Sequence, residues 1–154
     1  MKTNGKEVTG VYEDVLVIPR GSEQLVFKGR AIRDYTTFNA LCPPPKAPKI
    51  SKPTGDEADI TNPGYLAQMD NWSKQKFGWI VNETLYDTEF ETVDPEKPMT
   101  WNNWLTECND AGLSDAEQTA LVNFVLSLNT LTSSALEAAR SDFLRSIPES
   151  SPTE

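Results

Sequence analysis

The residue types that most often perform catalysis are absent from this chain or lack the necessary spacing. The sequence contains no histidine, which removes the commonest general base and a frequent metal ligand. No serine lies in a Gly-x-Ser-x-Gly pattern, and no group of glycines has the spacing of a phosphate-binding loop. Hydrolytic and nucleotide-dependent chemistry therefore have no candidate residues.

Carboxylates and thiols are the remaining reactive groups. Glu89 and Glu91 could in principle act as an acid–base pair or bind calcium, but no buried apolar context and no Asp-x-Asp-x-Asp-Gly frame surrounds them. Cys42 and Cys108 are separated by 65 residues and lack metal-ligand spacing. We therefore expect reduced thiols, no metal, no cofactor and no enzymatic activity.

The net charge of -9 at pH 7 is distributed unevenly along the chain. Residues 1–50 carry 8 basic and 5 acidic side chains, whereas residues 51–154 carry 6 and 18. A nucleic-acid or anionic membrane surface requires the opposite sign, so neither is an expected partner. The acidic stretch either keeps the protein in solution or imitates DNA phosphates to attract a basic partner; it comprises Glu83, Asp87, Glu89, Glu91, Asp94 and Glu96.

Aromatic side chains follow a helical spacing between residues 62 and 85. Asn62-Pro63 is a strong helix start, and the apolar residues that follow share one face. Tyr65, Trp72 and Trp79 form a seven-residue ladder along the edge of that face. Such a ladder is either part of the core or a partner-binding ridge, and both interpretations remain open at this point.

A proline-rich segment precedes this helix. Five of the eleven residues from 43 to 53 are proline, and lysines lie between them. This composition favours extended polyproline II structure rather than a packed element. Pro43, Pro44 and Pro45 are therefore either part of a spacer or a docking strip for an aromatic groove on another protein.

The remaining patterns predict an α+β fold in which an N-terminal β-hairpin packs on a mainly helical domain of four to five helices. The hairpin strands cover residues 14–19 and 24–32, and Asp34 caps a short helix. Further helices are predicted over 101–111, from the Ser114 capping box onward, and after Thr132. We expect the inward face of the last helix to consist of Leu136, Ala139, Phe143 and Leu144.

This pattern divides the chain into four predicted segments. They are a hairpin and short helix (1–42), a proline- and lysine-rich linker (43–61), a helical domain (62–148) and a disordered tail (149–154). The N-terminal residues contain no apolar secretion signal, so we expect a cytoplasmic protein.

The order of three segments resembles the tail assembly chaperones of long-tailed bacteriophages. The likeness rests on Val15 to Gly21 with Leu25 to Phe27, on Leu41 to Pro45, and on Leu121 to Asn129 followed by Leu136 to Arg140. The resemblance implies a non-enzymatic factor of the host cytoplasm that binds the tape measure protein, helps recruit tail tube subunits and is absent from the mature virion. Homo-oligomerisation is left open.

Two other functions fit the same sequence. An acidic DNA mimic would inhibit a host enzyme that binds nucleic acid, using carboxylates arrayed on one rigid face. A minor structural protein of the head-to-tail or tail region would remain in the purified virion. The expected partner-binding residues are the same aromatic ladder and proline run: Tyr65, Trp72, Trp79, Pro43, Pro44 and Pro45.

Overall fold

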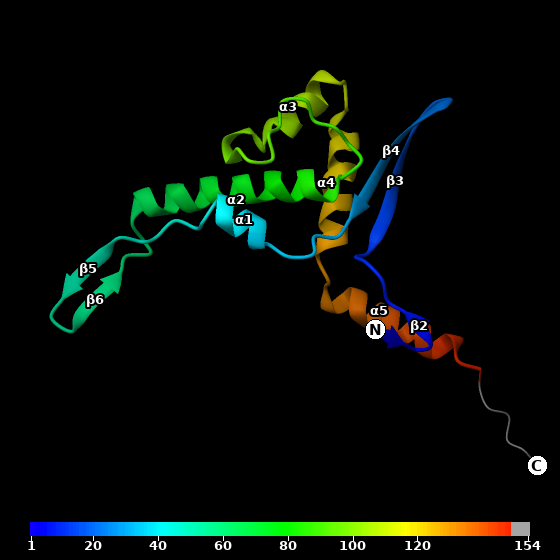
Figure 1. The fold of residues 1–154 in the computed structure, drawn as a ribbon, viewed down its shortest axis with the longest axis horizontal. Helices are drawn as coiled ribbons and strands as arrows, with labels where there is room; N and C mark the ends of the chain where they lie inside the picture. The colour runs from blue at the N-terminus through cyan, green and yellow to red at the C-terminus, as the bar shows by residue number, and fades with distance from the viewer. Residues whose placement is uncertain (149–154) are drawn as a thin grey trace, which may run out of the picture.

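The computed structural model describes residues 1–148 and has the predicted α+β fold. Three separate two-stranded antiparallel sheets accompany five α-helices and a short 3-10 helix within these residues (Figure 1). The strands are β1 (Lys2–Thr3), β2 (Lys6–Glu7), β3 (Glu13–Arg20), β4 (Glu23–Arg30), β5 (Lys49–Lys52) and β6 (Gly55–Ala58). The helices are α1 (Thr36–Leu41), α2 (Pro63–Thr84), η1 (Pro98–Thr100), α3 (Asn103–Asp110), α4 (Asp115–Asn129) and α5 (Ser133–Ser146).

The β3–β4 hairpin is the one predicted from the sequence. Arg20 pairs with Glu23 across a two-residue turn in which Gly21 has a φ of 61°, a value that glycine adopts without strain. Its apolar face packs on α4, and Gly29 is buried there. A Cβ at Gly29 would lie 2.5 Å from Leu128 Cδ1, so the glycine permits close contact between strand and helix.

The main core lies where α2, α3 and α4 meet beneath this hairpin. Asn62 caps α2 by accepting a hydrogen bond from the backbone N–H of Tyr65, and Ser114 and Glu117 form the predicted capping box of α4. These local signals therefore predicted both helix starts correctly. The buried residues of this core are Val81, Leu85, Trp104, Cys108, Leu121, Phe124, Val125 and Leu128.

A second core, formed by aromatic rings, joins α1 to the middle of α2. The Phe38 ring is fully buried, and its centroid lies 5.5 Å from that of Trp79 and 5.9 Å from that of Trp101. Cys42 is the fourth buried member of this cluster. The start of α1 differs slightly from prediction, because Tyr35 occupies the cap position while Asp34, one residue earlier, accepts a hydrogen bond from the Thr36 N–H.

The predicted linker contains a hairpin that the sequence analysis missed. Strands β5 and β6 pair along residues 49–58, with Gly55 at the turn and a 2.6 Å ion pair between Lys52 and Glu57. The prediction of unpaired polyproline II through residue 53 is therefore wrong over β5. All eight strand residues are exposed, so no alternation of apolar and polar residues signals the hairpin.

Two further predictions need correction around α3 and α5. The helix expected at Trp101 begins at Asn103, and Pro98–Thr100 forms the 3-10 helix η1 before it. The predicted inward face of α5 is wrong, because every residue of that helix is exposed. Thr130 has extended backbone angles, and α5 leaves α4 at a bend of 70° and points away from α2 and α3 (Figure 1). The tail prediction for 149–154 lies outside the described residues.

Candidate functional site

The reactive groups noted in the sequence are not assembled into a catalytic arrangement. Burial raises the pKa of both the Cys42 and the Cys108 thiol, and the two lie in different cores. Glu89 and Glu91 are exposed on the segment after α2. Across residues 1–148, no group of three or more acidic or cysteine side chains is placed to hold a metal ion.

The Glu107 carboxylate anchors the middle of the acidic segment between α2 and α3. Glu107 accepts hydrogen bonds from the backbone N–H groups of Glu91 and Thr92, at 2.7 and 3.1 Å, and from the Thr92 hydroxyl at 2.6 Å. Partial burial by itself would raise the pKa of Glu107, but these hydrogen bonds outweigh it and lower the pKa. The segment is therefore anchored at its centre, with most of its carboxylates directed to solvent.

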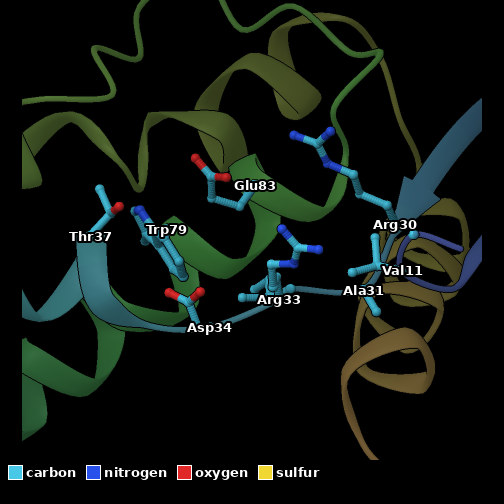
Figure 2. Close-up of a pocket in the computed structure, with 10 residues that line it drawn as sticks. Val11, Arg30, Ala31, Arg33, Asp34, Thr37, Trp79 and Glu83 are labelled. Carbon is cyan, nitrogen blue, oxygen red and sulfur yellow. The ribbon is translucent and has the colours of Figure 1, made fainter. Parts of the chain in front are cut away.

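A polar cleft of about 430 Å³ lies between the β4–α1 connection and α2. Figure 2 shows Arg33 and Glu83 extending into it, with Arg30, Asp34 and Trp79 around them. The Arg30 guanidinium lies 5.1 Å from the centre of the Tyr86 ring. The two arginines are balanced by two carboxylates, and the lining contains no serine, cysteine or lysine, so this cleft suits a small polar group.

An apolar groove of about 630 Å³ opens between α2, α3 and α4. We call it the α2/α3/α4 groove; its lining comprises Phe77, Trp104, Leu105 and Val122, with Ser73, Lys74 and Asn102 completing the lining. Its volume is typical of clefts that enclose ligands or side chains of a partner, which span about 300–1,000 Å³. Leu105 is 45% exposed although it lies among apolar neighbours.

Trp104, one of the lining residues, has a buried polar atom without a partner in the described part of the chain. The Trp104 side chain is only 4% exposed, and its Nε1 has no hydrogen-bond partner within residues 1–148. The Phe77 ring meets the Trp104 ring edge-on, at 6.3 Å between centroids. A buried donor without an acceptor costs about 1–3 kcal/mol, so Trp104 packs here at some cost in stability.

The structure buries the three residues of the predicted aromatic ladder to different degrees. Trp79 is 5% exposed and packs on Phe38 and Tyr35. Trp72 is half-buried, and its Nε1 donates a 2.9 Å hydrogen bond to the Cys42 carbonyl. Tyr65 is half-buried near the start of α2. Trp79 therefore presents almost no surface to a partner, which favours the core interpretation for this residue.

The proline run begins beside the same aromatic cluster. The hydrogen bond from Trp72 to the Cys42 carbonyl anchors the residue that precedes the run against α2. Pro43 and Pro44 are exposed and Pro45 is half-buried. The proline run therefore starts next to a residue that is bound to Trp72. Its prolines line neither the polar cleft nor the α2/α3/α4 groove.

The sequence analysis did not identify this groove as a binding surface. Two of its lining residues belong largely to the core, since Trp104 is buried and Phe77 packs against the main core. The overlooked signal is Leu105, which follows Trp104 and cannot share its inward direction on a helix. An exposed leucine beside two core aromatics marks the point where the core reaches the surface.

No family model, curated protein or solved structure matches this chain. The resemblance to tail assembly chaperones therefore remains a prediction. Through residue 148, no single helix has both the length and the hydropathy needed to cross a membrane; α4 and α5 together meet these two criteria but are bent by 70° relative to each other.

Proposed function

We propose that this chain is a non-enzymatic binding protein, and that it acts as a phage tail assembly chaperone in the host cytoplasm. In this role it binds the tape measure protein and helps recruit tail tube subunits. The observation that carries the proposal is the open α2/α3/α4 groove, an apolar surface on an otherwise acidic protein. Exposed apolar clefts of this kind commonly bind other polypeptides.

The distribution of charge supports the same function. A tape measure protein offers long helices with apolar faces, which aggregate unless a partner covers them and contributes charge. Residues 51–154 carry 18 acidic and 6 basic side chains, so a complex coated with this chain gains net negative charge and stays dispersed. The groove supplies the contact, and the acidic surface supplies the repulsion between complexes.

The contact surface differs from the one expected from the sequence. Because Trp79 and most of Trp72 are used in packing the aromatic cluster, we assign partner binding to the groove around Leu105 rather than to the ladder. Pro43 and Pro44, which are exposed, remain candidates for a secondary contact.

Affinity capture from phage-producing cells tests the proposal. Tagged protein is expected to recover a very large helical protein together with the tube subunit, identified by mass spectrometry. Leu105→Ser should weaken this recovery, whereas Val26→Ser, on the solvent face of β4 and 53% exposed, should not. Recovery of a host nuclease or polymerase instead would favour the DNA mimic, and detection of the chain in purified virions would favour the structural alternative.

A further inference from the structure

Helix α5 has an apolar stripe that no part of the described chain covers. Its large apolar side chains are about half exposed: Leu136 56%, Phe143 53% and Leu144 50%, with Ile147 at 49% just past its end. At 100° per residue, Leu136, Phe143 and Ile147 fall within about 40° of one another on the helix surface. A 14-residue helix that buries none of its residues is only marginally stable in water, so a cover over this stripe would stabilise it.

The same chain has an uncovered groove that its own α5 does not reach. The α2/α3/α4 groove lies among α2, α3 and α4, whereas α5 leaves the end of α4 at 70° and extends away from them (Figure 1). Only Thr130, Leu131 and Thr132 connect α4 to α5. Within residues 1–148, the apolar stripe of α5 therefore has no partner surface, and the α2/α3/α4 groove has no occupant. The short connection between α4 and α5 keeps the two apart within one chain.

We propose that α5 of one chain occupies the α2/α3/α4 groove of a second copy, and that the reciprocal exchange closes a homodimer. Exchange of one element through a short connection is a common route to a dimer. The proposal concerns the chain alone and does not depend on the phage assignment. A partner helix that binds the groove would then compete with α5 of the neighbouring copy.

The charge of α5 permits this contact in a strongly acidic protein. Glu137 and Asp142 are balanced by Arg140 and Arg145, so the helix has no net formal charge from its side chains. The helix itself therefore adds no charge repulsion where it contacts the groove.

The size of the contact favours a reciprocal exchange over a single docking. A 14-residue helix is about 21 Å long and about 10 Å wide, so covering one side buries on the order of 300 Å² of helix and a similar area of groove. One contact thus buries on the order of 600 Å², below the roughly 1,200 Å² of a stable interface. Two symmetric contacts reach about that threshold, which predicts a dimer that dissociates on dilution.

Sedimentation equilibrium of the purified chain tests the dimer directly. The wild type should be dimeric at high concentration and dissociate on dilution. Leu136→Glu with Phe143→Glu, and separately Leu105→Glu, should each raise the dimer dissociation constant at least tenfold. Val26→Glu, on the exposed face of the hairpin, should leave it unchanged. A wild type that is monomeric throughout, or a Leu105→Glu chain that still dimerises normally, would overturn the proposal.

Engineered cysteines identify which surfaces meet. Ala139→Cys lies on α5, and Ser73→Cys lies in the groove lining; the native thiols are buried and have raised pKa values, so they compete poorly. Mixing the two single variants under mild oxidation should give a mixed disulfide dimer. If the Ala139→Cys variant instead links mainly to itself, the helices pair with each other. A monomeric internal disulfide in the double variant would show that α5 folds back on its own chain, and either result refutes the exchange.

Discussion

Replacement of Phe38 by alanine is the sharpest test of the aromatic cluster that links α1 to α2. Phe38 is fully buried, and its ring centroid lies 5.7 Å from Trp72, 5.5 Å from Trp79 and 5.9 Å from Trp101. The substitution removes the one ring that contacts all three tryptophans. If the cluster is a core, the folded state should lose a large part of its stability.

The expected magnitude follows from the packing. A buried Phe→Ala change costs about 3–5 kcal/mol. The upper part of this range applies, because three aromatic pairs are lost and each contributes about 0.5–1.5 kcal/mol beyond burial. Trp72 is also tied to the Cys42 carbonyl by a hydrogen bond, which limits collapse into the cavity. We expect a loss of about 4–5 kcal/mol, a large share of the roughly 5–15 kcal/mol that stabilises a domain.

Urea unfolding followed by tryptophan fluorescence measures this loss. With a slope of about 2 kcal/mol/M, the midpoint should fall by about 2 M. Phe143→Ala is the matched control, because the same side chain is removed from α5 where it is 53% exposed. At the lowest workable protein concentration, this control should lose less than about 0.5 kcal/mol.

Two results would refute the reasoning. A loss below about 2 kcal/mol for Phe38→Ala would mean that the cluster does not pack as a core, and would return Trp72 and Trp79 to the candidate contact surface. A loss at Phe143 equal to that at Phe38, even in dilute solution, would mean that α5 packs within its own chain.

Three further predictions follow from the same structure. Gly29→Ala should lower the free energy of unfolding by about 1–3 kcal/mol through overpacking, while Val26→Ala on the opposite face of β4 should change it by less than about 0.5 kcal/mol in the same urea experiment. The hydrogen bonds from Arg20 lower the pKa of Glu117 from 4.5 to about 2. Its stabilising contribution is therefore present above about pH 4.5 and is lost as the pH falls towards 2. The Glu117→Gln variant should accordingly show a flatter acid-unfolding curve in that pH window. The native thiols should react with a disulfide reagent far more slowly in the folded protein than in urea at the same mildly alkaline pH, because burial raises their pKa values; rapid modification of the native protein would contradict their placement.

Local signals in the sequence correctly predicted where three of the helices begin. Asn62 before Pro63, the Ser114–Glu117 capping box and Thr132 each predicted the start of a helix, and the structure has all three. These signals succeed because a cap binds backbone groups within its own turn, so its effect depends on neighbouring residues alone. The turn at Gly21 was predictable for the same reason, because it depends only on the residues within the turn.

Predictions about which face is buried succeeded only where a partner element was available. The apolar face of α4 is covered because Gly29 lets the hairpin approach it. The similar apolar face of α5 was predicted to be buried and is exposed, since the extended backbone at Thr130 directs that helix away from the core. Amphipathic spacing indicates that one face of a helix is apolar. It does not indicate whether another element of the same chain packs against that face.

The candidate site illustrates the same difference. The absence of histidine and of nucleotide-binding patterns can be read directly from the printed residues, and so can the uneven charge. The exposure of Leu105 beside buried Trp104 cannot, because it depends on where α2, α3 and α4 leave a gap between them. Nor could the sequence decide whether Trp79 faces a partner or Phe38.

The sequence by itself determined the hairpin, the starts of the long helices and the acidic balance of the chain, because each of these depends on residue types and on contacts within a few positions. Only the tertiary structure decided that Trp72 and Trp79 pack on Phe38, that the α2/α3/α4 groove remains open, and that α5 has no cover within the described residues. Burial is a competition among apolar faces for a limited number of neighbours, and its outcome is set by how the elements meet in space.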